Sequence, residues 1–337
     1  MAGVTQVRVT EDEAGMRLDR WFRSHYPGLS QGMVNKLARK GQIRVDGGRV
    51  KANSRIEAGQ VVRVPPMPDD ATQAPVKTES ESHEVKLDQR QIEEIKSWVI
   101  HDDKHVVVIN KPHGLPVQGG SGLKKHLDGM LAALANKSGV APKLTHRLDK
   151  DTSGVLVLAR SDAAARHLTR AFRSRETIKD YWALTVGKPE VRAGKIDLPI
   201  LKGAAGKGER MRVDHENGKR AVTLFAIADS AGSSAAFVCL RPVTGRTHQL
   251  RIHLVEAGCP ILGDGKYGGP EARLDGAGVQ DRKMHLHARR LRIPHPSGNG
   301  FLDVTAPPPP YFKRTMKELG LEEGDAELAD ALIDQMQ

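Results

Sequence analysis

The sequence has few cysteines, few aromatic residues and no long apolar run. Its two cysteines, Cys239 and Cys259, form no CxxC pair and are too few to cross-link 337 residues, so we expect buried, reduced thiols. No apolar run approaches the roughly 20 residues that span a bilayer, and no signal-peptide core follows the amino terminus. We therefore predict a cytoplasmic protein without a membrane segment.

The histidines also lack the partners that a structural metal would need. His285 and His287 alternate as on a strand, but no cysteine or carboxylate stands near them at zinc spacing. We therefore expect no metal. What the chain does have is positive charge, because 52 Lys and Arg residues against 41 Asp and Glu give a net charge of +11. Such a field favours polyanions, and among these nucleic acid more than a membrane surface.

Length and composition divide the chain into domains. A chain of 337 residues exceeds the roughly 100–200 residues of one typical domain. After Pro65 the composition shifts to Pro, Asp, Thr, Glu and Ser with little to bury, which is typical of a flexible linker. We predict a domain over residues 1–65, a linker over 66–90, a larger domain over 91–312 and an extension over 313–337. The extension is predicted to be an acidic, loosely attached helix.

The predicted first domain has two helices, a hairpin and a basic surface. Leu18, Trp21 and Phe22 share one helical face, and a second helix capped by Ser30 ends at Gly41 with Met33, Val34 and Leu37 facing inward. Strands are expected over 42–45, 49–52 and 61–64, with a turn at 46–48. Residues 1–64 contain twelve Lys and Arg against six Asp and Glu. One interpretation of this charge is a solvated basic face.

The predicted larger domain alternates short apolar runs with two helical patterns. The runs predict strands over 106–109, 155–158, 181–186, 222–227, 235–240 and 285–293, and the helical patterns cover 161–173 and 248–257. This order favours an α+β domain around a largely antiparallel sheet with few helices.

The stretch HRLDKDTSG, residues 146–154, concentrates opposite charges directly before an apolar run. One interpretation is an internally salt-bridged turn. A calcium loop is excluded because its twelfth position, which needs a bidentate Glu, holds Arg160. A glycosidase pair is disfavoured by the i, i+2 spacing of Asp149 and Asp151. GAAGKGE, residues 203–209, lacks the spacing and the Ser/Thr of a phosphate-binding loop, and we expect a basic surface loop there.

HRLDKDTSG resembles the second motif of the RluA-type RNA pseudouridine synthases. Further segments are similar to that family in order and spacing, namely VVVINKPHGLPV, IKDYWALTVG, MRVDHENGKRAVT, PVTGRTHQLRIHL, LGDGKYGG and LHARRLRIPHP. Residues 17–62 resemble the RNA-binding module named after ribosomal protein S-four. The resemblance covers about nine tenths of the chain. It implies an RNA pseudouridine synthase of the group that acts on large-subunit ribosomal RNA.

The resemblance also implies roles for particular residues. Asp149 would be the catalytic aspartate, with Arg251 as its ion-pair partner on a helix that Thr247 can cap. Tyr181 would stack on the target uracil and help to remove the proton from carbon five. Arg147 would fill the gap that a flipped uridine leaves. Packing and an exposed phosphate contact are the alternative interpretations of Tyr181 and Arg251.

RNA is the partner that these features imply. Arg246, in the turn before the second helical pattern, is a candidate phosphate contact, and the candidates in the first domain are Lys36, Arg39, Lys40 and Arg44. We expect a monomer that needs no cofactor. The alternatives are a transfer RNA synthase, a non-catalytic RNA-binding or ribosome assembly protein, and a nucleosidase-type hydrolase. Attack of the aspartate on ribose, its attack on the base and glycal formation remain open routes.

Overall fold

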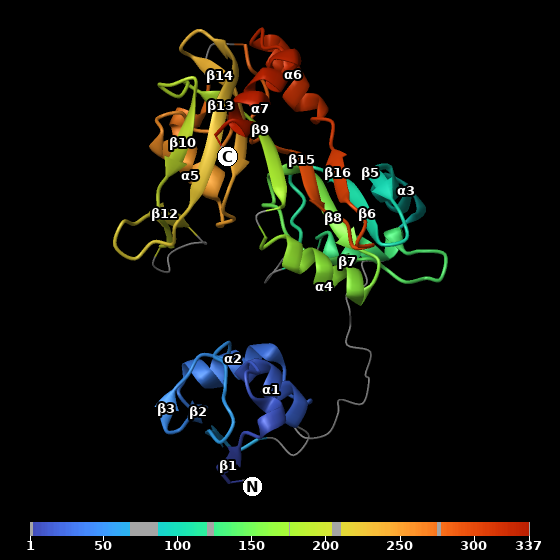
Figure 1. Ribbon diagram of the computed structural model, residues 1–337, viewed down its shortest axis with the longest axis vertical. Helices are drawn as coiled ribbons and strands as arrows, with labels where there is room; N and C mark the ends of the chain where they lie inside the picture. Colours follow the sequence, from blue (N-terminus) through green and yellow to red (C-terminus); the bar gives the residue numbers. More distant parts are fainter. Residues whose placement is uncertain are drawn as a thin grey trace. The chain divides into compact units, whose positions relative to one another are not determined.

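The computed structural model describes residues 3–67, 87–119, 125–174, 176–203, 210–274 and 278–336. The chain forms two compact units, Met1–Ser82 and His83–Gln337 (Figure 1). Of the predicted linker, residues 68–86 lie outside the described residues. Its last residues do not belong to a linker, because helix α3 (Gln89–Ser97) begins there. The Asp88 carboxylate caps this helix by accepting the Gln91 amide N–H at 2.8 Å.

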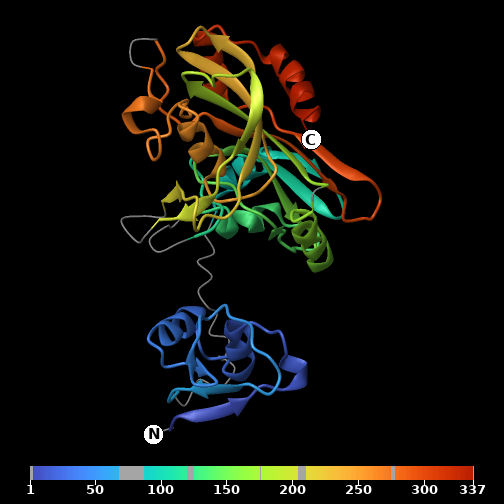
Figure 2. The ribbon, with the colours of Figure 1, turned by 60° about the vertical axis from the view of Figure 1, so that its left-hand side comes forward.

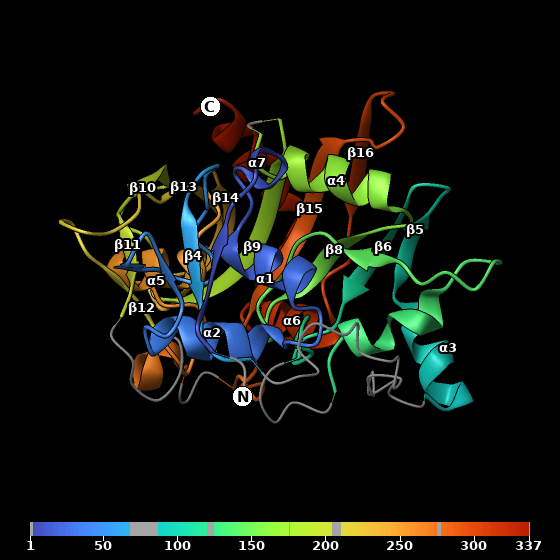
Figure 3. The same cartoon turned by 90° about the horizontal axis from the view of Figure 1, so that it is seen from below.

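The amino-terminal unit packs two helices against a four-stranded sheet (Figure 3). The helices are α1 (Leu18–His25) and α2 (Gln31–Arg39), after a short 3₁₀ turn, η1 (Glu11–Glu13). The strands lie in the order β1 (Thr5–Arg8), β4 (Val61–Val64), β2 (Arg44–Val45) and β3 (Gly48–Arg49). Trp21 and Phe22 are fully buried in its core. The prediction that Met33 faces inward is wrong, because α2 buries Val34 and Ala38 and leaves Met33 42% exposed.

The second unit is built on a ten-stranded mixed sheet, and its α+β class with mostly antiparallel pairing confirms the predicted fold class. The strand order is β10-β13-β14-β9-β15-β8-β6-β5, with β16 beside β15 and β7 beside β8. The bounds are β5 (Val99–Asp102), β6 (Val106–Lys111), β7 (Lys143–Leu144), β8 (Ser153–Ala159), β9 (Ile178–Val186), β10 (Ala193–Asp197), β13 (Val222–Ala231), β14 (Ala235–Pro242), β15 (Leu286–Pro294) and β16 (Phe301–Thr305). A separate pair joins β11 (Ile200–Lys202) and β12 (Met211–Val213).

Helices cover both faces of this sheet, which is why its central strands are apolar on both sides. At the β8 end, α4 (Asp162–Ala171) packs on one face, and α3 with the 3₁₀ segment η2 (Asp128–Leu134) packs on the other. At the β14 end, α5 (Gln249–Glu256) lies on one face. The opposite face carries α6 (Pro310–Glu318) and α7 (Ala326–Asp334). Short 3₁₀ turns are η3 (Gly269–Ala272) and η4 (Glu323–Asp325).

The carboxyl-terminal residues are part of the core, and the predicted loosely attached helix is wrong. Both α6 and α7 pack on the sheet (Figures 1 and 2, red), and Phe312 and Ile333 are fully buried. Asp334 also forms an ion pair with Arg241, whose side chain is almost completely buried. The acidic residues that suggested a loose segment lie largely on the exposed side of these helices. The boundary predicted at residue 312 therefore cuts through α6.

The seam between the two halves of the sheet is the pair β8 and β15. These strands run parallel, with Ser153 opposite His287 and Gly154 opposite Ala288. At Gly154 φ is +112°, and a Cβ atom there would lie 2.1 Å from the Ala288 carbonyl oxygen. The backbones approach so closely that only glycine fits. This close approach fixes the end of HRLDKDTSG against the sheet.

Candidate active site

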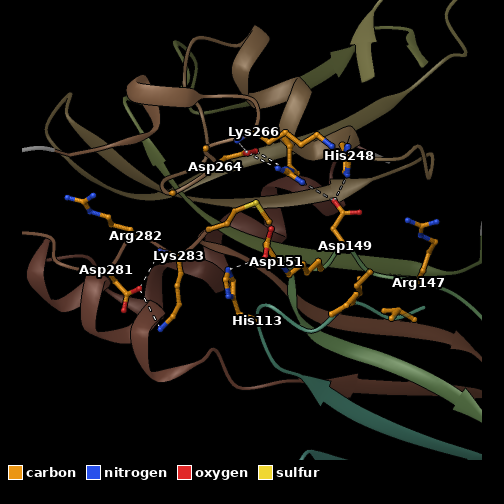
Figure 4. A pocket seen from close by; sticks show the side chains of 18 of the residues that line it. His113, Arg147, Asp149, Asp151, His248, Asp264, Lys266, Asp281, Arg282 and Lys283 are labelled. Carbon is orange, nitrogen blue, oxygen red and sulfur yellow. Dashed lines mark hydrogen bonds and ion pairs between the residues drawn. The ribbon is translucent and has the colours of Figure 1, made fainter. Parts of the chain in front are cut away.

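A large cleft in the second unit lies beside the loop that precedes β8 (Figure 4). It has a volume of about 1370 Å³. Its charged and histidine lining is His113, Arg147, Asp149, Lys150, Asp151, His248, Arg251, Asp264, Lys266, Asp281, Arg282, Lys283 and Arg314. Cationic side chains outnumber carboxylates in this set, so the cleft suits an anionic ligand. A second chamber of about 360 Å³ shares Arg147, Asp149, His248 and Arg251 with it and adds Phe172, Lys179 and Tyr181.

The charged loop is held by the side chains of Leu148 and His146 and not by salt bridges within it. Residues 146–154 are all described, and no ion pair joins two of their side chains. Instead Leu148 is buried, and the His146 ring accepts the Val157 amide N–H at its Nε2, at 2.9 Å. The interpretation of this stretch as an internally salt-bridged turn is therefore wrong. The loop presents its charges outward to the surrounding cleft.

A buried lysine supports this loop from below. Lys111, at the end of β6, is fully buried, and its ammonium donates to the carbonyl oxygens of Pro112, Leu115 and Lys150 at 2.8, 2.9 and 3.1 Å. Burial lowers the pKa of Lys111 to about 7, whereas the Asp151 and Asp149 carboxylates act in the opposite direction. The lysine thus ties β6 to the backbone directly after Asp149.

The Asp149 carboxylate has only long contacts with the neighbouring side chains. Its side chain is 20% exposed, and its Oδ2 lies 3.5 Å from Arg251 Nη1 and 3.6 Å from His248 Nε2 (Figure 4). Among the described residues its carboxylate accepts no hydrogen bond within the usual distance. The carboxylate therefore sits between two nitrogen groups, with room for a ligand to complete its contacts.

Arg251 has a second acidic partner, which the sequence analysis missed. Its Nε and Nη2 donate to the two carboxylate oxygens of Asp264 at 2.8 and 2.7 Å. Asp264 is fully buried and also accepts the amide N–H groups of Lys266 and Tyr267. The Arg251 guanidinium lies 5.0 Å from the centre of the Tyr267 ring. The predicted ion pair of Arg251 with Asp149 is present at 3.5 Å, and the structure adds the shorter, bidentate contact with Asp264.

His248 is a further site residue that the sequence analysis missed. It precedes α5 in the left-handed conformation, with φ of 56°, which is unusual outside glycine. The prediction that Thr247 caps this helix is wrong, because His248 is the N-cap residue and no side chain caps it. Its Nδ1 lies 2.6 Å from the Tyr267 hydroxyl, which accepts the Met211 amide N–H at 3.0 Å.

These contacts favour one tautomer of His248. The Tyr267 hydroxyl accepts the Met211 amide N–H, and its own proton is free to be donated to His248 Nδ1, 2.6 Å away. The ring proton of a neutral His248 then resides on Nε2 and faces Asp149. Burial lowers the pKa of His248, Asp149 raises it, and Arg251 and Lys266 lower it. Burial therefore favours the neutral ring, whose Nε2 lies 3.6 Å from Asp149 Oδ2.

Tyr181 forms a wall of the second chamber. It lies on β9, is half-buried, and its phenol is close enough to Asp149 for the carboxylate to contribute to its raised pKa. Burial is the main cause of that increase, so the phenol keeps its proton at neutral pH. Its strand neighbours Asp180 and Trp182 face the opposite side and are buried. A flat ring beside a carboxylate is suited to hold a planar base.

The other predicted RNA contacts lie in different environments. Arg147 is exposed on the rim that both chambers share and points away from the Asp149 carboxylate (Figure 4). Arg246 is exposed at the second chamber, where its Nε donates to the Arg220 carbonyl at 3.1 Å. Lys36, Arg39 and Lys40 are exposed on or directly after α2. Arg44 differs, because its guanidinium donates to the Gly41 and Gly47 carbonyls and supports the hairpin turn.

Across the described ranges, no cluster of three or more His, Cys, Asp or Glu side chains has a geometry that could hold a metal ion. No helix in this part of the chain is long and apolar enough to cross a membrane. Cys239 and Cys259 are buried free thiols, as predicted. The segment 204–209, which contains most of GAAGKGE, lies outside the described residues.

Known proteins resemble this chain in sequence and in fold. Residues 105–256 match the family model described as RNA pseudouridylate synthase. Ribosomal large subunit pseudouridine synthase C of Escherichia coli K12 is 35% identical over 315 residues, which are 93% of this chain and 96% of that protein. The protein of the same name from Vibrio parahaemolyticus is 34% identical over 304 residues, 89% of this chain and 92% of that protein.

Two solved human structures share the fold. Human RNA Pseudouridylate Synthase Domain Containing 4 has a TM-score of 0.58 and 34% identity, and the match covers 68% of this chain and 96% of that chain. Human RNA Pseudouridylate Synthase Domain Containing 1 has a TM-score of 0.52 and 27% identity over 66% of this chain and 94% of that chain.

Proposed function

The chain belongs to the RNA pseudouridylate synthase family, and from this premise we propose that it isomerises uridines of large-subunit ribosomal RNA with Asp149 as the reactive carboxylate. The chain is an RNA pseudouridine synthase, and its relatives named for the ribosomal large subunit match it over almost their whole length. The observation that carries the assignment of Asp149 is its position. It is the carboxylate that lines both chambers, and its contacts of 3.5 and 3.6 Å leave it free to meet a substrate.

The reaction rearranges bonds within one nucleotide. The bond from the ribose anomeric carbon to the ring nitrogen breaks, the uracil turns, and a new bond forms to carbon five. Carbon five then loses a proton, and the ring nitrogen gains one, so no oxidant, reductant or external group is needed. The protein must supply a carboxylate, a surface that keeps the detached uracil, and an enclosed space.

Three neighbours of Asp149 suit these tasks. Tyr181 offers its ring as the platform for the uracil in the second chamber. Because its pKa is raised, it can take the carbon-five proton only after giving up its own, so we assign it mainly to stacking. Arg251 orients the carboxylate, and Arg147 on the shared rim replaces the uridine in the RNA stack. Asp264 is fully buried and bound to Arg251, which disfavours the water activation that a hydrolase needs.

We test the reactive carboxylate with ribosomal RNA transcripts that carry tritium at carbon five of uracil. The parent chain should release tritium, and Asp149→Asn should reduce the rate by at least about 10⁴-fold. The matched control is Asp151→Asn, which changes a 43% exposed carboxylate of the same loop and should keep most of the activity. Release by Asp149→Asn at the parent rate would contradict the assignment. A transfer RNA transcript with the same label, run in parallel, tests the substrate class. Faster release of tritium from transfer RNA than from ribosomal RNA would overturn the proposal that ribosomal RNA is the substrate.

The amino-terminal unit supplies a second RNA contact in this proposal. Lys36, Arg39 and Lys40 are exposed together at the end of α2, where they suit RNA phosphates. Changing all three to Gln should flatten the dependence of log affinity on log salt by about 0.7–0.9 per lost phosphate contact. The control changes the exposed Arg8, Arg20 and Arg23 to Gln, which removes equal charge from outside α2. If both triple variants have the same slope of log affinity against log salt, α2 has no special role in RNA binding.

A further inference from the structure

Lys179 is a largely buried cation that lacks a partner. It lies on β9, two residues before Tyr181, and lines the second chamber with Phe172 and His146. Among the described residues, no carboxylate, carbonyl or hydroxyl forms an ion pair or hydrogen bond with its ammonium. The other buried cations nearby differ, because Arg251 binds Asp264 and Lys111 binds three carbonyls. An unpaired cation in this position is costly for the free protein.

The surroundings of Lys179 cannot compensate its charge. Burial lowers the pKa of Lys179, and no nearby carboxylate acts in the opposite direction. The neighbouring His146 uses its Nε2 to accept the Val157 amide N–H, and its ring packs against Phe172 at 4.3 Å between centroids. Burial and the Lys179 charge lower the pKa of His146 to about 3, so this ring stays neutral. The chamber therefore carries net positive charge, because Arg147, Lys179, Arg246 and Arg251 line it with one carboxylate, that of Asp149, which forms no ion pair with Lys179.

The register of β9 determines what can reach Lys179. Residues two apart on a strand face the same side and lie about 7 Å from each other along the strand. Lys179 and Tyr181 therefore face the same chamber, which Asp149 also lines. A nucleotide whose base rests on Tyr181 brings its own sugar and a flanking phosphate into this chamber. That phosphate is the anion that RNA supplies to an otherwise unpaired ammonium.

We propose that Lys179 binds a phosphodiester next to the flipped uridine, and that this ammonium acquires its counter-ion only when RNA enters the second chamber. The inference rests on the proposed function, because it takes the second chamber as the place of the target nucleotide. It assigns to β9 a phosphate-binding residue beside the base platform. It also explains why the free protein keeps a buried charge that its own residues do not neutralise.

The first test compares stability with RNA binding in the full chain. Lys179→Met keeps the length of the side chain and removes the charge, so the melting temperature without RNA should stay unchanged or rise by up to about 4 °C. Affinity for the ribosomal transcript should fall several-fold, and its salt slope should flatten by about 0.7–0.9. Lys188→Met, on the exposed residue after the same strand, is the matched control and should bind as the parent does. A lower melting temperature with an unchanged slope would show a purely structural lysine and overturn the proposal.

The second test locates the phosphate. Binding is measured to a short ribosomal stem-loop in which one linkage at a time near the modified uridine is a neutral methylphosphonate. One linkage should weaken binding to the parent several-fold and have no further effect on Lys179→Met. If every linkage affects both proteins equally, the contact does not exist. Both tests use the Asp149→Asn background, so they depend on binding alone and remain informative even if the parent fails to release tritium.

Discussion

Asp264 and Asp149 share Arg251 and differ in almost everything else. Asp264 is fully buried and receives two guanidinium hydrogen bonds at 2.7 and 2.8 Å. Asp149 is 20% exposed and meets the same guanidinium at 3.5 Å. A buried carboxylate whose oxygens are all hydrogen-bonded within the protein typically positions its partner side chains. A carboxylate with only long contacts to the protein can still bind or react with a ligand. Asp264 thus holds Arg251 in place, and Asp149 contacts the same guanidinium only at longer range.

The largest effect expected from this contrast is on stability. Asp264→Asn removes the bidentate counter-ion of the buried Arg251 guanidinium and leaves only the longer contact with Asp149, which should lower the free energy of unfolding by about 3–5 kcal/mol. We expect Asp149→Asn to unfold like the parent, because its contacts are long. Chemical denaturation of the three proteins measures the difference. Asp281→Asn is the control, because this aspartate pairs with the more exposed Lys283 and Arg314 and its loss should cost less than about 1 kcal/mol. Equal destabilisation by the two site variants would refute the distinction.

A smaller effect should appear at the other neighbour of Asp149. Tyr267→Phe removes the hydroxyl that contacts His248 Nδ1 and should cost about 1–2 kcal/mol of stability. Without that donor, Nδ1 can be protonated more easily, so the pKa of His248, which burial holds below 6.5, should rise. The acidic limb of the pH profile of kcat should consequently move to higher pH, because a charged His248 would compete with the substrate for contact with the Asp149 carboxylate. As the pH falls, His248 in the variant is then protonated at a higher pH than in the parent.

The pH profile of tritium release between pH 5 and 8 measures this shift. Tyr311→Phe is the control, because its buried hydroxyl donates to the Met284 carbonyl at 3.1 Å, and the variant should lose similar stability without moving the limb. Coincident profiles for parent and Tyr267→Phe would show that the hydroxyl has no influence on His248.

The apolar runs of the sequence were sufficient to predict the fold class and the central strands. Runs such as Val155 to Leu158 are apolar on both faces, and strands covered on both sides need that pattern. The carboxyl-terminal helices were misjudged because abundant acidic residues obscured the buried positions Phe312 and Ile333. Strand β1 was missed because it is short and mostly exposed, so its pairing with β4 depends on contacts distant in sequence.

The candidate site was only partly predictable for a related reason. Asp149, Arg251 and Tyr181 line a common chamber, but the spacing of residues did not indicate that Arg251 also binds Asp264. That contact depends on the turn after α5, thirteen positions along the chain from Arg251, which brings the acid back to the guanidinium. The left-handed backbone of His248 was likewise not predictable from residue type, because histidine adopts this conformation more often than most residues but still only in a small minority of cases.

The close approach of Gly154 to Ala288 has a consequence for how this enzyme can diverge. Five positions separate Asp149 from a backbone crossing that tolerates no side chain at all. The position of the Asp149 carboxylate is therefore set by main-chain geometry, so the exposed residues around the cleft can be exchanged without displacing it. The rim of the cleft can therefore vary, whereas Gly154 cannot be replaced by a residue with a side chain.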